Sequence, residues 1–124
     1  MKKVLLFIGM TIFTFSMNAQ TVNGLELEDI PARYVEIVSQ AKMFKAFQVT
    51  VYLDYGQIGT MKDISKGHII NKETGKLESF NGAIGALNYL EKRGFRYKSE
   101  YFLSAGNSNI LHILLENTNY DKSK

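Results

Sequence analysis

Apolar and polar residues alternate most regularly between residues 47 and 55, in the segment FQVTVYLDY. A period of two residues is typical of a β-strand that has one buried face. The apolar face consists of Phe47, Val49, Val51, Leu53 and Tyr55, and Gly56 ends the pattern. Residues 34–38, with the sequence YVEIV, are dense in β-branched and aromatic side chains and predict an earlier strand.

The hydrophobic period changes in residues 79–95, SFNGAIGALNYLEKRGF. Apolar side chains recur there every three or four positions, which predicts an amphipathic helix whose core stripe contains Phe80, Ala83, Ile84, Leu87 and Leu90. Gly94 is expected to end the helix in a left-handed conformation. Alternation resumes in residues 95–103 and 110–116, and the intervening GNSN predicts a hairpin between two further strands.

The order ββαββ predicts a two-layer α+β sandwich. One helix can cover only one face of a four-stranded, mostly antiparallel sheet. We expect the second face to be open and to carry Tyr52, Lys98, Phe102 and His112. The buried layer is expected to place the helix residues Ile84, Leu87 and Leu90 over Val49, Val51, Leu53, Tyr97, Tyr101, Leu111, Ile113 and Leu115.

Residues 1–19 have the pattern of an export signal. Lys2 and Lys3 precede an apolar run of about a dozen residues, which is shorter than the roughly 18 to 20 residues that a membrane-spanning helix needs. Cleavage after Ala19 would leave Gln20 as the new amino terminus. We therefore expect an exported protein, periplasmic or extracellular, with no stable membrane insertion after the signal is removed.

Removal of the signal changes the charge of the protein. The chain has 15 Lys and Arg against 12 Asp and Glu, and residues 1–19 hold two of the lysines and no acidic residue, so the net charge falls from +3 to +1. At that charge, composition does not support nucleic-acid binding. The remaining 105 residues suffice for one domain. We place this domain at residues 32–116, between a lead at 20–31 and a disordered tail at 117–124.

Four segments together resemble a family of small exported bacterial proteins of unknown function. They are the strand at Tyr34-Val35, the stretch FNGAIGALNYLEKRGF, the basic and aromatic strand after it, and the closing ILHILLEN. In such proteins an LN helix runs into GW or GF and then a strand pair, as Leu87-Asn88 and Gly94-Phe95 do here. The resemblance covers about residues 32–116. The resemblance supports the predicted fold, but it indicates no particular activity.

No motif in the chain predicts catalysis, a cofactor or a metal site. A phosphate-binding loop requires G-x-x-x-x-G-K-[ST], but Gly75-Lys76 is followed by Leu77 and has no glycine five positions before it. The two histidines lack metal-ligand spacing, and without cysteine or a G-x-S-x-G segment no nucleophile is presented. We predict that the protein is not an enzyme. A remote alternative is a hydrolytic or metal cluster at the loop 56–78, formed by His68 with Asp54, Asp63 and Glu73.

The first of two non-enzymatic functions is a small exported interaction or assembly module. It would act as a homodimer or with an unknown protein partner. Gly82, Gly85 and Tyr89 are its candidate partner-binding residues, because they lie opposite the predicted core stripe and glycine allows close approach of another chain. A plainer interpretation is that the helix simply tolerates these glycines.

The second function is a ligand-binding or inhibitory domain that uses the open sheet face. Tyr52, Phe102 and His112 would stack on a sugar or a peptide, and Lys98 would donate a hydrogen bond to it. The competing interpretation is that the loop 56–78 covers this face.

Overall fold

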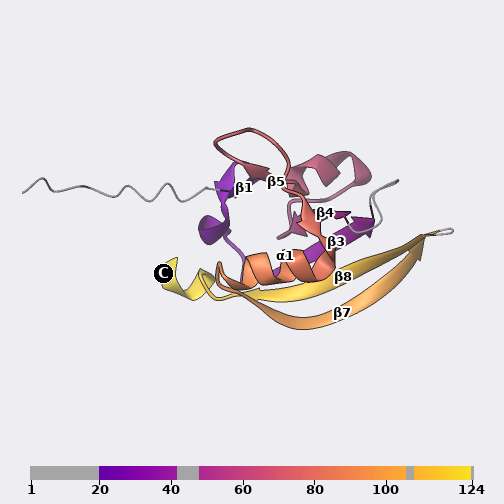
Figure 1. The fold of residues 1–124 in the computed structure, drawn as a ribbon. Coiled ribbons are helices and arrows are strands. Elements are labelled where there is room, and N and C mark those ends of the chain that lie inside the picture. The colour runs from indigo at the N-terminus through magenta and orange to yellow at the C-terminus, as the bar shows by residue number, and fades with distance from the viewer. Residues whose placement is uncertain (1–19, 42–47, 106–107, 124) are drawn as a thin grey trace, which may run out of the picture.

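The computed structural model describes residues 20–41, 48–105 and 108–123. These residues form eight strands, one α-helix and three short 3-10 helices (Figure 1). The elements are β1 (Gln20–Val22), β2 (Leu25–Glu26), η1 (Leu27–Asp29), β3 (Tyr34–Ala41), β4 (Gln48–Asp54), η2 (Met61–Gly67), β5 (Ile69–Asn71), β6 (Phe80–Asn81), α1 (Gly82–Glu91), β7 (Phe95–Ala105), β8 (Ser108–Asn117) and η3 (Tyr120–Ser123).

The strands form two antiparallel sheets. One has three strands in the order β2-β1-β5, and the other has five in the order β6-β4-β3-β8-β7. The predicted fold class, a single four-stranded sheet with one helix, is therefore wrong, since the described residues are mostly β and form two sheets, of three and five strands. The four predicted strands occur as β3, β4, β7 and β8. The additional strands β1, β2, β5 and β6 have only two or three residues each, too few to show a periodic pattern.

The small sheet and η1 close one end of the hydrophobic core. Val22, Leu27 and Ile30 are almost completely buried, and Ile69 of β5 joins them in the same cluster. Residues 20–31, which the sequence predicts to precede the domain, thus supply part of its core. Isolated apolar positions among polar neighbours gave no helical or strand period by which this role could be recognised.

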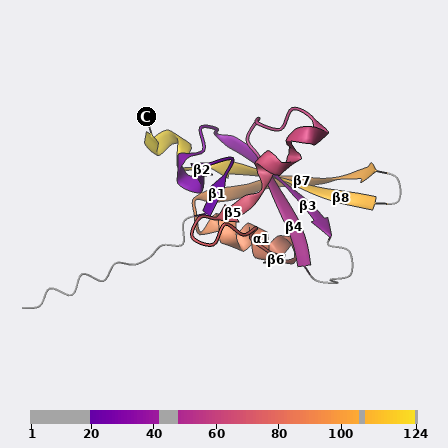
Figure 2. The same ribbon diagram turned by 90° about the horizontal axis from the view of Figure 1, so that it is seen from above.

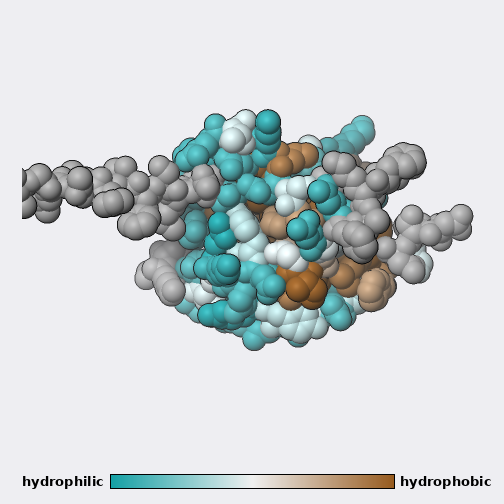
Figure 3. Space-filling model, in the orientation of Figure 1, coloured by the Kyte–Doolittle hydropathy of each residue, from teal (hydrophilic) through white to brown (hydrophobic). Residues whose placement is uncertain are grey.

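Helix α1 covers one face of the large sheet (Figure 2). Its buried residues are Ala86 and Leu90, with Ala83 and Leu87 partly buried beside them. Ile84, expected in the core, has 66% of its surface exposed. Ala86 occupies the contact instead, because a small side chain lets the helix lie close to the sheet. Apolar surface consequently remains over α1 and over the β7–β8 hairpin (Figure 3).

A β-bulge at Lys98 reverses the faces of β7. Tyr97 pairs with Leu115, but Ser99 pairs with the very next residue of β8, so Lys98 is an extra residue in the strand. One inserted residue moves every following side chain to the face opposite to that expected from simple alternation. Among the residues that the sequence analysis assigned to a face, the reversal concerns Tyr101 and Phe102.

Tyr101, predicted in the buried layer, opposes His112 on the open face and is 43% exposed. Phe102, predicted on the open face, opposes Leu111 on the face that α1 covers. The prediction for each residue is therefore wrong about its face.

The C-terminal residues fold back on the start of the domain. Asn117 is 1% exposed, and its Nδ2 donates to the carbonyl oxygens of Ile30 (3.1 Å) and Ala32 (3.0 Å). Beyond it, the Arg33 guanidinium pairs with the Asp121 carboxylate at 2.9 Å. The segment predicted as a disordered tail is thus attached to the domain as far as η3.

Candidate functional site

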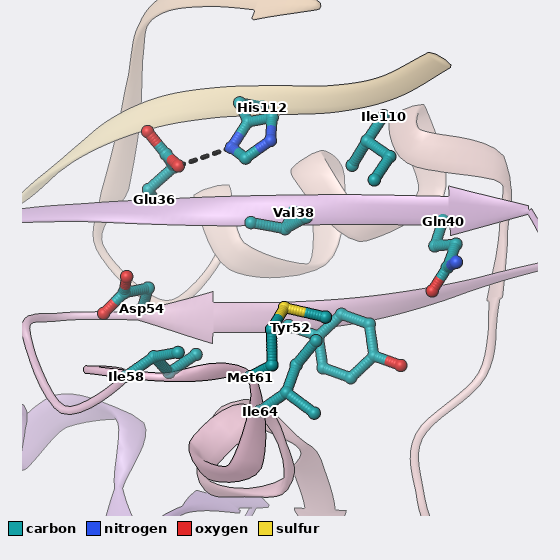
Figure 4. Close-up of a pocket in the computed structure, with 10 residues that line it drawn as sticks. All are labelled: Glu36, Val38, Gln40, Tyr52, Asp54, Ile58, Met61, Ile64, Ile110 and His112. Carbon is teal, nitrogen blue, oxygen red and sulfur yellow. Dashed lines mark hydrogen bonds and ion pairs between the residues drawn. The ribbon is translucent and has the colours of Figure 1, made fainter. Parts of the chain in front are cut away.

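A cavity of about 290 Å³ lies between the open face of the large sheet and the segment that follows β4 (Figure 4). Its floor comes from β3, β4 and β8, which are neighbours in the sheet. Its wall comes from the chain around η2. The lining residues are Glu36, Val38, Gln40, Tyr52, Asp54, Ile58, Met61, Ile64, Ile110 and His112.

Side-chain contacts to β4 hold the wall over the sheet. Gln57 Nε2 donates to the carbonyl oxygens of Leu53 (2.7 Å) and Lys66 (3.3 Å), which ties both ends of the segment together. The rings of Tyr52 and His68 stack with their centroids 5.0 Å apart. Residues 58–68 therefore cover part of the open face. The sequence alone left open whether the loop 56–78 covers this face.

Gly67 lies where this segment crosses β4. A Cβ atom at this position would approach Ile58 Cδ1 to 2.8 Å and the carbonyl oxygen of Leu53 to 3.2 Å. A side chain here would require the end of Ile58 to turn away and the contact with β4 to widen by a few tenths of an ångström. The close approach that forms the cavity wall thus depends on glycine.

Three polar side chains form a hydrogen-bonded array beside the cavity. Tyr101 and His112 face each other on adjacent strands, and their rings stack at 4.8 Å with an interplanar angle of 13°. The Glu36 carboxylate joins both, because Oε1 lies 2.6 Å from His112 Nδ1 and Oε2 accepts a 2.6 Å hydrogen bond from the Tyr101 hydroxyl. Figure 4 shows the contact between Glu36 and His112 at the upper edge of the cavity. We call these three residues the Glu36 array.

The Glu36 array raises the pKa of Tyr101 to about 12, chiefly through the hydrogen bond to the Glu36 carboxylate. We expect Glu36→Gln to return this pKa toward 10, the ordinary value for tyrosine. The raised pKa stabilises the folded state below about pH 10, and this contribution is lost as the pH rises through about 12. A residue-resolved NMR titration measures the shift.

Tyr89 provides an internal control for this titration. Its pKa is also raised to about 12, but the main cause is burial rather than a carboxylate partner. The Glu36→Gln substitution should leave the Tyr89 titration unchanged. If both tyrosines shift together, the change reflects general loosening of the fold and contradicts the specific role of Glu36.

The cavity combines aliphatic walls with acidic groups. Glu36 and Asp54 are directly opposite each other on β3 and β4, so their side chains lie on the same face. None of the described residues that line the cavity is a lysine or an arginine. Lys98, the predicted donor on this face, instead pairs with Glu116 at 2.8 Å. The arrangement favours a ligand that carries positive charge.

The structure brings together two of the four predicted ligand-face residues, since Tyr52 and His112 both line the cavity. One ring face of each is already occupied, by His68 and by Tyr101 respectively. Lys98 and Phe102 do not line it. The cavity therefore has two of the predicted aromatic side chains, Tyr52 and His112, among aliphatic ones.

The predicted partner-binding residues lie along α1. Gly82 begins the helix with a φ of 73°, and Gly85 would accept a Cβ at ordinary contact distance of 3.9 Å from its neighbours. Tyr89 packs edge to face against Phe80, with the Arg93 guanidinium 3.6 Å from its ring centroid. Tyr89 is thus engaged within its own domain. Gly82 needs its left-handed backbone for the turn into the helix, and this requirement explains the glycine without a partner.

Sequence reasoning missed most of the cavity. Glu36 and Asp54 each alternate with buried residues in their strands, which indicates only that they face away from the core. The pairing of β3 with both β4 and β8 brings them beside His112, and pairing order is not visible in local periodicity. Tyr101 was missed because of the bulge.

The residues of the remote alternative, a hydrolytic or metal cluster, do not form a metal-binding group in the described part of the chain. In that part of the chain, no three His, Asp or Glu side chains are placed to hold a metal ion. Asp63 instead binds Thr60 and Lys66. The pKa of its carboxyl group is lowered, and the hydrogen bond to Lys66 makes the largest contribution to this shift.

Comparison with known proteins identifies no relative. The chain matches no protein-family model, no curated protein and no solved structure. None of the helices in residues 20–41, 48–105 and 108–123 is both long and apolar enough to cross a membrane.

Proposed function

We propose that this protein is a small exported binding protein whose cavity takes an amphipathic organic cation, such as an aliphatic amine or a lysine-like side chain. The observation that carries the proposal is that Glu36 and Asp54 lie directly opposite each other on neighbouring strands, in a cavity whose other lining residues are mainly apolar. Export rests on the signal predicted at residues 1–19.

The apolar part of the ligand would contact Val38, Ile58, Ile64 and Ile110. Cavities that bind small molecules are usually lined mainly by apolar side chains, with a few polar groups that fix the orientation. Met61, which is 82% exposed, stands at the rim. Its flexible side chain suits a contact that adapts to ligands of different shape.

The charged end of the ligand would lie near Glu36 and Asp54. Asp54 keeps its Oδ1 as acceptor for the Gly56 amide at 2.8 Å, which orients the carboxylate. Glu36 is oriented by its two partners in the array. Two carboxylates held by their own hydrogen bonds can meet a cation with little loss of side-chain freedom.

Three probes of equal length test the proposal. Hexylamine, hexanol and hexanoate have six carbon atoms each and end in a cationic, a neutral and an anionic group, respectively. We expect isothermal titration calorimetry to give the affinity order amine, alcohol, carboxylate. Asp54→Asn should weaken the amine about three- to tenfold, as expected for one partly exposed charge pair, and leave the alcohol unchanged.

Two further variants test the apolar contact with the cavity floor and the effect of an acidic group outside the cavity. Val38→Thr keeps the shape of the side chain but adds a hydroxyl to the cavity floor, so it should weaken all three probes alike. Glu73→Gln removes an exposed acidic group in the turn after β5 and should change none of them. Equal affinity for the three probes, or tightest binding of hexanoate, would contradict the proposed ligand class.

A further inference from the structure

Strand β7 is an edge of the five-stranded sheet and pairs only with β8 among the described residues. Its outer row of backbone N–H and C=O groups therefore has no strand partner in that part of the chain. The β7–β8 hairpin extends beyond the rest of the fold at its far end (Figure 2). An edge of this kind is a template for another strand.

The two halves of β7 differ in how they resist such pairing. The first half holds Arg96, Lys98 and the bulge, which are features that protect sheet edges. Residues 99–104 pair regularly with β8 and hold one charged residue, Glu100. In the same half, Tyr101, Phe102 and Leu103 are 43%, 65% and 51% exposed. Protection is therefore missing where the apolar surface is largest.

We infer that two copies of this protein associate edge to edge through residues 99–104 of β7, with Phe102 on the two-fold axis. In an antiparallel pair, residues directly opposite each other lie on the same face of the sheet. Phe102 of each copy then opposes Phe102 of the other on the α1 face. Tyr101 opposes Leu103 on the open face, and this contact occurs twice.

The register about Phe102 is favoured by the charges of the strand. An axis at Glu100 would place two glutamates opposite each other and would bring the bulges into the contact. An axis at Phe102 places Glu100 opposite Ser104 and opposes no like charges. Three exposed apolar side chains from each copy are covered together. Figure 3 shows that apolar surface continues from this hairpin over α1.

A second copy of the protein is the partner that fits this edge best, because residues 99–104 can pair with the same residues of that copy. Two-fold symmetry needs one patch that matches its own image, and residues 99–104 supply the aromatic centre and its apolar flanks. This association is independent of ligand binding and goes beyond the proposed function. The ligand titrations and the measurement of the oligomeric state can therefore be interpreted separately, and a negative result in one does not affect the other.

Sedimentation equilibrium of the protein purified from a host that expresses the full chain tests the association. We expect a dimer. Phe102→Lys and Phe102→Glu should each weaken it at least tenfold, because two like charges would meet on the axis. An equimolar mixture of the two variants should restore dimers, because lysine then opposes glutamate. Rescue by mixing is specific to residues that face each other.

Ile84→Lys is the matched control, since Ile84 is an equally exposed apolar residue on α1. It should leave the dimer intact. Ser104→Lys is an independent variant that places a lysine opposite Glu100 and should tighten the dimer a few-fold. Circular dichroism verifies that each variant is folded.

Three results would overturn the inference. They are a wild-type protein that is monomeric at its highest soluble concentration, a dimer that Phe102→Lys does not weaken, and a mixture that stays monomeric. If the Phe102 variants do not fold, an unchanged or weaker dimer for Ser104→Lys overturns the register on its own.

Discussion

Phe95→Ala is expected to lower the free energy of unfolding by about 3 to 5 kcal/mol, as truncation of a buried phenylalanine usually does. Phe95 is the largest completely buried side chain in the described residues and begins β7 directly after Gly94. It belongs to the core cluster with Leu90 of α1 and Leu115 of β8. Because a domain of this size is stable by only about 5 to 15 kcal/mol, the loss removes a large share of that stability.

Phe102→Ala is the matched control in the same strand. Phe102 is 65% exposed, so its truncation should change the free energy of unfolding by about 0.5 kcal/mol or less. Urea titrations of both variants, at protein concentrations low enough to exclude association, give the comparison. Equal losses would contradict the assignment of Phe95 to the core.

Asn117→Ala is expected to cost about 2 to 4 kcal/mol, because it removes the donor from two carbonyl oxygens and leaves them without that hydrogen bond. Asn117 Nδ2 donates to Ile30 and Ala32, and its Oδ1 accepts from the Asn119 amide at 3.1 Å. The side chain thus fastens the end of β8 to the turn before β3. Thermal and urea unfolding measure the loss.

Asn88→Ala provides the comparison for this substitution. Asn88 lies exposed on α1, where alanine is the better helix former, so stability should stay the same or rise slightly. Hydrogen exchange adds a local readout, since Asn117→Ala should speed exchange in residues 30–33 before it affects β4. If Asn117→Ala has the same free energy of unfolding as the wild type, the carbonyl groups of Ile30 and Ala32 form hydrogen bonds with water that replace those of Asn117, and the prediction is contradicted.

The fold was predictable where an element is long enough to show its period. β4 and α1 were found because seven and ten residues display alternation and a helical stripe. The three-stranded sheet was not, because β1, β2 and β5 hold two or three residues each and are defined by pairing between distant segments. Ile84 shows the same limit, since the buried stripe of α1 depends on the surface that it contacts.

The candidate site was predictable only in part. Tyr52 and His112 were found because they alternate with buried neighbours in β4 and β8. Glu36 could not be placed beside them, because its neighbours follow from the central position of β3 in the sheet. Tyr101 could not be placed either, since one extra residue at Lys98 reverses its face and leaves no local trace in the sequence.

The unequal edges of the large sheet set a limit on polymer growth. The edge opposite β7 is β6, which has two residues, and further along β4 the Tyr52–His68 bridge occupies the outer side. A subunit with two free edges could add copies indefinitely and build fibres, whereas a subunit with one can join only a single neighbour. Sheet extension through β7 would therefore stop at ten strands, because the first pairing uses the one long edge of this sheet in the part of each copy that the structure describes.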